Sequence, residues 1–417
     1  MIKKGKSPTE NKKVAKAKEI KEKSSIEKIK VPNDEAPKKE RGKTGMYHDI
    51  KDLAQKKLSK LEYENQLKNM DYEKVMTGHG YMTDGIIGGF AASIHKMEYT
   101  FFKQVLLGVL SGFIIGFGYT ACTYAVMSLG GDNAAMMERM IMAIIFPFCI
   151  VLITFLGGGL YTSHVLATIP TMKGAVKIDH YIRGIFGVLL GNILGTGIFV
   201  SIAAMAGILE DSVFLGKAHD IGIHKLYNIG HVIDEHKYTE EILSDLFPNL
   251  SQEAKDRILQ LKSAQDFDTP GFDITIKDVV LTMLFCLGSG ILCNIMVSST
   301  LPLTASTKNS STTVIIICLP IFLFVMMGLQ HGPANTFFLW IFVWELFLNA
   351  GQDGFHVNTQ MVIIGSFIFA NVIPTLIGNW IGGGIVLPGL LHLINIKYTS
   401  VYFAKTKYDM DHHTDEY

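Results

Sequence analysis

The feature of this sequence that most restricts its fold is the distribution of its charged residues. Six stretches, 26 to 43 residues long, contain no Asp, Glu, Lys or Arg: 104–129, 140–172, 184–209, 279–307, 309–344 and 354–396. A soluble domain places charge on every helix and strand, because each element keeps one face in water. Uncharged apolar runs of more than 18 residues predict membrane-spanning helices. We therefore expect an all-α polytopic membrane protein with six spans, which excludes a soluble fold.

The charges outside these runs predict how the chain is oriented in the membrane. Residues 1–80 hold 21 basic and 13 acidic residues, whereas 209–278 hold 7 basic and 14 acidic ones. Segments rich in Lys and Arg stay on the cytoplasmic side, so both termini are expected inside, in the plasma membrane, with the acidic segment outside. The basic tail could contact anionic lipid or nucleic acid, but we interpret it as a solvated tail with no nucleic-acid partner.

This topology divides the chain into five parts. We expect a basic, largely disordered tail with an amphipathic helix (1–80), a first three-helix repeat (81–208) and an external acidic insertion (209–276). A second three-helix repeat (277–398) and a cytoplasmic tail (399–417) follow. Leucines and isoleucines between 243 and 261 predict one or two short helices within the insertion.

Two of the six runs are interrupted by glycine. The second breaks at Gly157-Gly158-Gly159, and the fifth breaks at Gly328-Leu329-Gln330-His331-Gly332-Pro333. Non-helical backbone at membrane depth is tolerated only where it is buried in protein or lines a wet cavity. The motif at Gly191-Asn192 in the third run returns at Gly378-Asn379 in the sixth. Three spans per half predict an inverted repeat with the solute path at its centre. The alternative explanation of the repeated glycines is that they only allow helices to pack closely.

Few polar groups in the runs are candidates for function. His331 is an ionisable residue at a backbone break, which makes it a functional candidate by default, although a buried neutral histidine bonded to backbone is the alternative. Thr162 follows the first break, and its alternative is a hydroxyl bonded to its own helix. We interpret His164 and His392, which lie nearer the ends of their runs, as interface or packing residues.

Histidines and cysteines do not predict a metal site. The insertion contains His219, His224, His231 and His236, for which metal binding or pH sensing is an alternative to our interpretation as solvated loop residues. The cysteines all lie inside the apolar runs without metal-ligand spacing, and we expect them to pack in the helices: Cys122, Cys149, Cys286, Cys293 and Cys318. We expect no metal and no cofactor.

The sequence lacks the motifs of other classes of membrane protein. The uncharged runs contain no carboxylate for an intramembrane enzyme, and the polar segments contain no phosphate-binding loop for an ATP-driven pump, so we expect no enzyme. A water or glycerol channel with the same repeat logic would show paired Asn-Pro-Ala breaks. The second break reads Gly332-Pro333-Ala334-Asn335 instead.

Four segments resemble the formate/nitrite transporter family. Gly328–Asn335 is similar to its G-F-E-H-S-x-A-N motif, and Asn371–Gly384 to its N-L-I-P-x-x-x-G-N-x-x-G-G motif. Gly159–Ser163 resembles G-A-D/E-L-F-T-S, and Leu292–Val297 resembles G-C-N-x-L-V. The resemblance covers roughly 95–205 and 275–398 in order. Gly159 and Gln330 replace acidic residues that the family commonly has.

This resemblance implies an aquaporin-like fold and a homopentamer in which each protomer has its own pore for a small anion or its acid. The pathway residues that it implies are apolar constrictions, a central polar pair and flanking polar positions: Phe146, Ile150, Leu160, Phe324, His331, Asn335, Thr162, Tyr161 and Asn294. The family also has a lysine before the fourth span that guides anions into the outer vestibule, and Lys277 is the nearest candidate.

The function that we expect is transport of a weak-acid anion of the formate, nitrite, lactate or acetate class, together with protons, across a lipid membrane. A bare ion cannot cross an apolar ring, because its desolvation costs several kcal/mol or more, so the substrate would be protonated near His331. An anion-channel mode is the competing variant. The alternatives are a water or small-neutral-solute channel of aquaporin-like architecture and a hydrosulfide channel.

Overall fold

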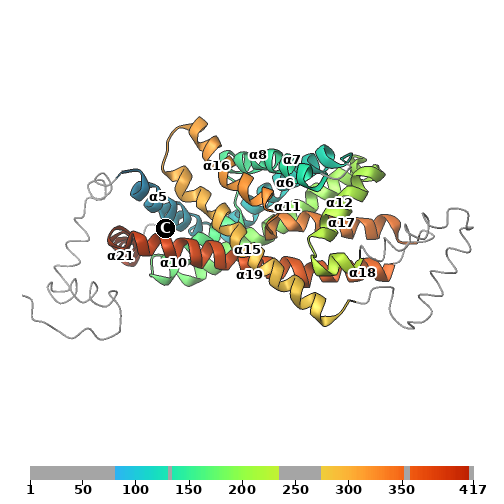
Figure 1. The fold of residues 1–417 in the computed structure, drawn as a ribbon. Helices are drawn as coiled ribbons and strands as arrows, with labels where there is room; N and C mark the ends of the chain where they lie inside the picture. Colours follow the sequence, from blue (N-terminus) through green and yellow to red (C-terminus); the bar gives the residue numbers. More distant parts are fainter. Residues whose placement is uncertain (1–79, 130–133, 234–273, 352–356, 413–417) are drawn as a thin grey trace, which may run out of the picture. The chain divides into compact units, whose positions relative to one another are not determined.

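The computed structural model describes residues 80–129, 134–233, 274–351 and 357–412, and every regular element within them is a helix (Figure 1). Several predicted features lie outside these residues: the tail up to residue 79, with its amphipathic segment, the apolar residues between 243 and 261, and His236. Five of the described helices or helix runs are long and apolar enough to cross a membrane, and a shorter apolar helix belongs to a further, interrupted span. The prediction of an all-α polytopic membrane protein is confirmed.

The first half contains two long helices and one broken span between them. The long helices are α6 (Phe101–Val126) and α11 (Ile178–Met205). The broken span comprises α7 (Ala134–Ile145), α8 (Pro147–Phe155), α9 (Tyr161–His164), η1 (Val165–Ala167) and α10 (Thr168–Met172). Helix α8 ends just before the three consecutive glycines, and Gly157 has a φ of 74°, which favours glycine at this position. The first break therefore lies where the glycines predicted it.

The second half repeats this order. It begins with α15 (Ile276–Ala305), whose N-terminus is closed by a capping box between Thr275 and Asp278. The broken span consists of α16 (Ser310–Met326) and α17 (Gly332–Asn349). The last span, which runs from residue 357 to 394, contains α18 (Val357–Ser366), η3 (Phe367–Val372), α19 (Ile373–Trp380), η4 (Ile381–Val386) and α20 (Leu387–Ile394), where η3 and η4 are π-helical.

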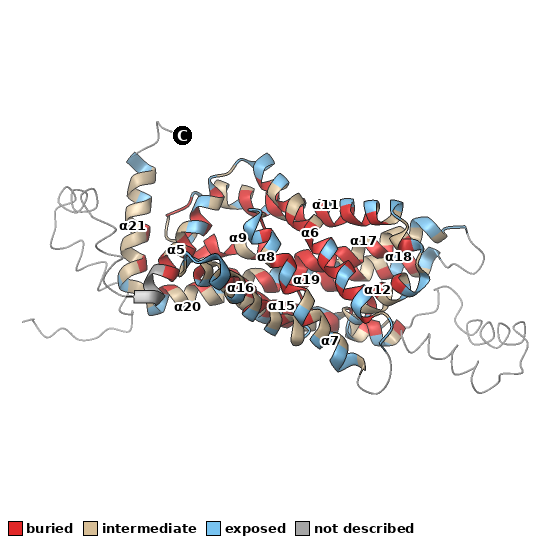
Figure 2. Ribbon diagram, turned by 90° about the horizontal axis from the view of Figure 1, so that it is seen from above, coloured by how far each residue is buried: buried red, intermediate tan, exposed pale blue. Residues whose placement is uncertain are grey.

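Glycines bring the outer helices of each half into close contact. A Cβ atom at Gly191 or Gly195 of α11 would overlap a backbone carbonyl of α6. A Cβ atom at Gly378 of α19 or at Gly382 of η4 would overlap a backbone carbonyl of α15 in the same way. Buried residues gather along the facing sides of α6, α11, α17 and α19, whereas α7 and α16 carry many exposed ones (Figure 2). The repeated glycine motif is thus a helix-packing device in both halves.

Three of the described helices that lie beside the six spans pack closely against them. Helix α5 (Gly80–Met97), for which the sequence predicted no separate element, packs against α15 with Gly89 directly over Pro302. Its Phe90 ring meets Phe403 of α21 (Ile396–His412) at 5.1 Å, so the predicted C-terminal tail is a packed helix as far as His412.

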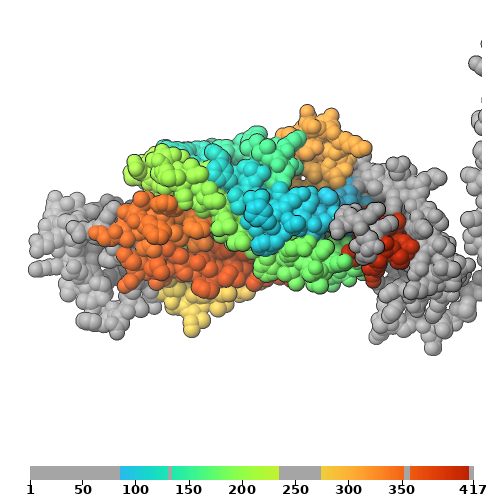
Figure 3. Space-filling view, turned by 180° about the vertical axis from the view of Figure 1, so that it is seen from behind, coloured from blue at the N-terminus to red at the C-terminus, as the bar shows by residue number. Residues whose placement is uncertain are grey.

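The third is α12 (Ser212–His224), in the predicted external insertion. Its residues Phe214, Ala218 and Ile223 are fully buried, because the helix packs on α17 and α6. The space-filling view shows this segment in yellow-green beside α6 and α17, on the same face of the described region (Figure 3). Helices α5 and α21 lie at the opposite end of the spans from α12 (Figure 1).

Candidate solute pathway

The two breaks meet at a hydrogen bond between Thr162 and His331. Thr162 Oγ1 lies 3.1 Å from His331 Nε2, and both side chains are buried. His331 caps the N-terminus of α17, where its Nδ1 accepts a hydrogen bond from the Ala334 N–H at 3.2 Å. Since Nδ1 is an acceptor, the neutral ring carries its proton on Nε2 and donates it to the Thr162 hydroxyl. Thr162 thus has a partner from the other half of the protein.

An asparagine holds the backbone of the first break. Asn192 of α11 donates to the Gly159 carbonyl at 2.9 Å and to the Gly108 carbonyl at 3.1 Å. Its Oδ1 accepts the Tyr161 N–H at 3.0 Å. These bonds satisfy backbone groups that cannot bond within a helix at this break, where an unpaired group would be costly.

A second asparagine holds the other break in the same way. Asn379 of α19 donates to the Gln330 carbonyl at 3.2 Å and to the Gly290 carbonyl at 2.8 Å, and it accepts the Gly332 N–H at 2.8 Å. Each asparagine therefore binds the carbonyl of one residue in its break, the N–H two residues later, and a glycine carbonyl of the first helix in its half. This shared pattern gives the predicted inverted repeat a chemical basis.

Helix α15 connects the two breaks. Asn294 donates to the Thr162 carbonyl at 3.1 Å and to the Asn379 carbonyl at 2.7 Å. Ser298, one turn further along, also donates to the Thr162 carbonyl, at 2.6 Å. Asn294 therefore positions the backbone of Thr162, whose side chain contacts His331.

Buried amides form a network behind His331. Gln330 Oε1 accepts from Asn335 Nδ2 at 2.8 Å and from Asn371 Nδ2 at 3.4 Å, and Asn335 Nδ2 lies 2.8 Å from Asn371 Oδ1. Asn335 Oδ1 is buried and has no hydrogen-bond partner among the described residues. A buried acceptor of this kind costs about 1–3 kcal/mol unless a solute or water binds it. Asn335 lies one helical turn after His331, so this open acceptor belongs to the first turn of α17.

Apolar side chains border the Thr162–His331 pair. The ring centroids of Phe146 and Phe324 lie 6.2 Å apart at nearly a right angle, and Phe324 lies 6.0 Å from the His331 ring. Ile150 and Leu160 are buried in the same hydrophobic cluster as the two phenylalanines. The four residues expected at the constrictions therefore all belong to this one hydrophobic cluster.

Tyr161 has a different environment. Its ring belongs to a separate cluster with Val165, Ile185 and Val188, and its hydroxyl donates to the Leu376 carbonyl at 3.1 Å. These contacts connect α9 to α11 and α19. The side chain therefore supports the helix that begins at the first break.

Lys277 lies on the exposed first turn of α15. Lys225, which sequence reasoning missed, directly follows α12 and is half-buried, with its Nζ 5.7 Å from the Tyr119 ring centroid and 5.4 Å from that of Phe338. Burial lowers the pKa of Lys225 from 10.5 to about 8. Within the described part of the chain, Lys225 forms no ion pair with a carboxylate.

Hydrogen bonds seat the turn that carries Lys225. Asn371 Nδ2 donates to the Lys225 carbonyl at 2.8 Å, which joins this turn to the amide network behind His331. Thr282 of α15 donates to the Leu226 carbonyl at 2.8 Å. Tyr227 has a φ of 47°, unusual for a residue other than glycine, and its ring stacks on Phe285 at 4.3 Å. The turn is therefore held firmly against α15 and η3.

A second lysine lies near the first break. Lys96, at the end of α5, is half-buried and places its Nζ 3.4 Å from the Ser163 hydroxyl, beside Thr162 in the chain. Burial lowers the pKa of Lys96 to about 8. His164 is fully buried and contacts Gln104 Oε1 at 2.9 Å, in agreement with its interpretation as a packing residue.

The histidines of the insertion make specific contacts. His219 Nδ1 lies 2.8 Å from Glu345 Oε2, and His224 Nδ1 lies 2.7 Å from the Asp220 carbonyl. The interpretation of His219 as a solvated loop residue is wrong, because α12 folds onto α17 and brings it to the buried Glu345. Within the described ranges, no group of three or more His, Cys, Asp or Glu side chains could hold a metal ion.

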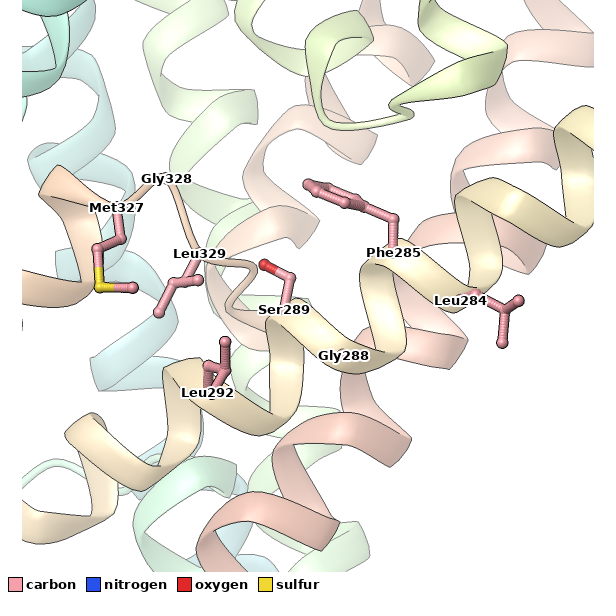
Figure 4. Close-up of a pocket in the computed structure, with 8 residues that line it drawn as sticks. All are labelled: Leu284, Phe285, Gly288, Ser289, Leu292, Met327, Gly328 and Leu329. Atoms are coloured by element: carbon pink, nitrogen blue, oxygen red, sulfur yellow. The ribbon is translucent and has the colours of Figure 1, made fainter.

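A pocket of about 340 Å³ opens beside the second break (Figure 4). Ser289 supplies a polar side chain to its lining, and its hydroxyl accepts the Gln330 N–H at 3.0 Å. The other lining residues are apolar or glycine: Leu284, Phe285, Gly288, Leu292, Met327, Gly328 and Leu329. The lining of this pocket is therefore mostly apolar.

Two broken spans, held by matching asparagines around a buried Thr–His pair, define a polytopic membrane protein of the channel and transporter class. The sequence model described as "Formate/nitrite transporter" matches residues 88–393. This chain belongs to the formate/nitrite transporter family.

Its relatives include the formate channel FocA of Escherichia coli strain K12, which is 23% identical over 337 residues, 78% of this chain and 92% of FocA. The formate-nitrite transporter of Plasmodium falciparum is 24% identical over 309 residues, 72% of this chain and 80% of that protein. A solved structure titled "FNT family ion channel" superimposes with a TM-score of 0.51 at 14% identity, covering 76% of this chain and 99% of that one. The last similarity shows the shared fold.

Proposed function

We propose that the protein transports small monovalent anions of weak acids, of the formate, nitrite, lactate or acetate class, together with protons. The observation that carries the proposal is the Thr162–His331 hydrogen bond, which joins the two broken spans between apolar side chains. It supplies one polar step in an otherwise apolar passage. The names of the relatives, a formate channel and a formate-nitrite transporter, agree with this substrate class.

Two lysines would attract the anion toward this passage. Lys225 lies beside Tyr119 and Phe338, and Lys96 lies beside Ser163, next to Thr162 in the chain. Neither has an ion-pair partner among the described residues, so each ammonium is available to an anion. We therefore assign to Lys225 the vestibule role that the family resemblance suggested for Lys277.

The central step is protonation of the substrate. An ion entering the apolar ring loses hydration, which raises the pKa of a weak acid and favours its neutral form. The neutral acid passes Phe146 and Phe324, accepts a hydrogen bond near His331, and ionises again in the opposite vestibule. Because anion and proton cross together, the net result is symport.

The hydrogen bonds of His331 favour solvent as the source of the proton. His331 Nδ1 already accepts from the Ala334 N–H, and only Nε2 meets Thr162. Releasing the Nε2 proton would leave an imidazolate anion in an apolar site unless the Nδ1 bond broke first. His331 therefore acts as a hydrogen-bond donor to the substrate, and water in the vestibule supplies the transferred proton.

The proposed assembly is a homopentamer in the plasma membrane, with a pathway in each protomer and both termini in the cytoplasm. Large apolar side chains are exposed on several spans, including Phe117, Phe186 and Leu319. Such side chains require lipid or a neighbouring subunit to cover them. The basic N-terminal segment and the acidic insertion support the orientation.

Uptake of labelled formate, nitrite and lactate into proteoliposomes, with and without an imposed pH gradient, tests the proposal. We expect uptake that increases with an inward proton gradient, and a loss of at least tenfold in His331→Ala. Swelling rates measured in the same vesicles test the alternative, a water channel. Rapid swelling without uptake of any small anion would refute the proposal, and uptake indifferent to the gradient would refute proton coupling.

A further inference from the structure

Tyr119 lies between Lys225 and the phenylalanine constriction. Its ring centroid is 4.9 Å from that of Phe146 and 4.6 Å from that of Phe338, while Lys225 Nζ lies 5.7 Å from the ring. Through Phe146 and Phe324, these contacts form a continuous series from Lys225 to His331. Tyr119 therefore occupies the first step after the lysine.

The hydroxyl of Tyr119 lacks a protein partner. The residue is only 6% exposed, and its hydroxyl has no hydrogen bond within the part of the chain that the structure describes. Other largely buried tyrosines of this protein are bonded: Tyr161 donates to Leu376, and Tyr181 contacts Thr168 and Trp380. The hydroxyl oxygen is not among the fully buried side-chain atoms that lack a partner, so it lies where a water molecule or a solute can reach it.

The surroundings of this hydroxyl suit an anion. The Tyr119 ring contacts the rings of Phe146, Phe337 and Phe338, the buried Cys122 and Cys149 belong to the same hydrophobic cluster, and Lys225 supplies positive charge. A phenol hydroxyl donates a hydrogen bond as readily as it accepts one, and a hydroxyl on a ring that an ammonium faces can join that ammonium in binding a carboxylate or nitrite oxygen. A phenylalanine here would preserve the aromatic packing but could not make this bond.

We propose that Tyr119 is a specificity-determining residue: its hydroxyl donates a hydrogen bond to the anion held by Lys225, before the anion reaches Phe146. This inference rests on the proposed transport of small anions and adds a binding subsite to it. The subsite recognises a small oxyanion through one ammonium and one phenol. It thereby selects oxyanions over neutral solutes before the desolvation step.

The test is Tyr119→Phe, which removes the hydroxyl and keeps the ring. In proteoliposomes we expect the half-saturation concentration for formate to rise about tenfold, the size of a hydrogen bond to a charged group, with the maximal rate within twofold of wild type. The matched control is Tyr124→Phe on the same helix, where the hydroxyl belongs to a 39% exposed side chain, and we expect no change. An unchanged half-saturation in Tyr119→Phe, or equal losses of affinity and rate, would overturn the proposal.

A double-substitution cycle tests whether both groups hold the same anion. If they do, Tyr119→Phe should have a smaller effect in a Lys225→Met background than in wild type, because the two contacts are coupled. A full tenfold effect in that background would contradict the shared subsite. Elution of each variant at the wild-type size-exclusion volume shows that the comparison is made on folded protein.

Binding without transport separates this inference from the proposed function. Formate bound to the folded protein raises its midpoint of thermal unfolding, with sodium chloride as the ionic-strength control. If wild type shows this rise without any uptake, and Tyr119→Phe weakens it, the subsite stands while the transport proposal fails. If neither formate, nitrite nor lactate stabilises or crosses the membrane with wild type, the subsite is refuted as well.

Discussion

Replacing Asn379 with leucine tests how the second break is held open. The variant keeps a similar side-chain volume but removes the bonds to the Gly290 and Gln330 carbonyls and to the Gly332 N–H. At roughly 1 kcal/mol net for each hydrogen bond, the expected loss of stability is about 3 kcal/mol, and more if the freed groups stay dry. In detergent this should appear as a fall of several degrees in the midpoint of thermal unfolding, and formate uptake should drop sharply.

The matching substitution in the other half is Asn192→Leu, which removes the corresponding three bonds at the first break. The inverted repeat predicts a loss of similar size. Asn395→Leu is the control, because its amide makes one bond, to the Leu391 carbonyl at 3.0 Å, at the end of α20. Wild-type stability in Asn379→Leu would show that its hydrogen bonds do not stabilise the second break. A severe loss of stability in only one of the two variants would show that the hydrogen bonds at the two breaks are not equivalent.

Further predictions concern the central pair, the vestibule and the α12 segment. Thr162→Val removes the acceptor for His331 Nε2–H, and we expect uptake to fall about tenfold with little change in the half-saturation concentration. An unaffected uptake rate would argue against a role for the Thr162–His331 hydrogen bond. Lys225 has its pKa lowered to about 8, so its charge is present below this pH and is lost above it. The half-saturation concentration for formate, which stays ionised throughout, should therefore rise between pH 7 and pH 9 in wild type. Lys225→Met should remove this rise, and the same rise in the variant would assign the titration elsewhere. His219→Ala breaks the contact with Glu345, and we expect about 1 kcal/mol of destabilisation with faster proteolysis after α12. A rate of proteolysis equal to that of wild type would contradict a role for His219 in holding α12 on α17.

The sequence alone predicted the spans and their breaks with good accuracy. Membrane insertion depends on local composition, because each span must satisfy its own backbone and exclude charge. For this reason the uncharged runs matched the spans, and Gly157 and Gly328 marked the two breaks. The echo of Gly191-Asn192 and Gly378-Asn379 indicated the repeat, although not the hydrogen bonds by which the two asparagines hold the breaks.

The lysine that we propose for the vestibule could not be identified from sequence. Lys277 was chosen because it precedes the fourth span, whereas Lys225 reaches Tyr119 because the chain after α12 folds back onto α15 and η3. Such a return depends on Thr282 and Asn371, which are distant from Lys225 in the chain. Helix α5 was missed for a related reason, since its stabilising contacts are with Pro302 and Phe403.

What the sequence by itself determined is therefore the membrane class, the six spans, the two glycine breaks and the place of His331 at the second break. These features follow from hydropathy and backbone chemistry, which act over neighbouring residues. Only the tertiary structure decided that Thr162 faces His331, that Asn192 and Asn379 hold the breaks, and that Tyr119 and Lys225 lie together. Those pairings join residues from separate spans or from a loop and a span, and their hydrogen bonds form only when the helices pack.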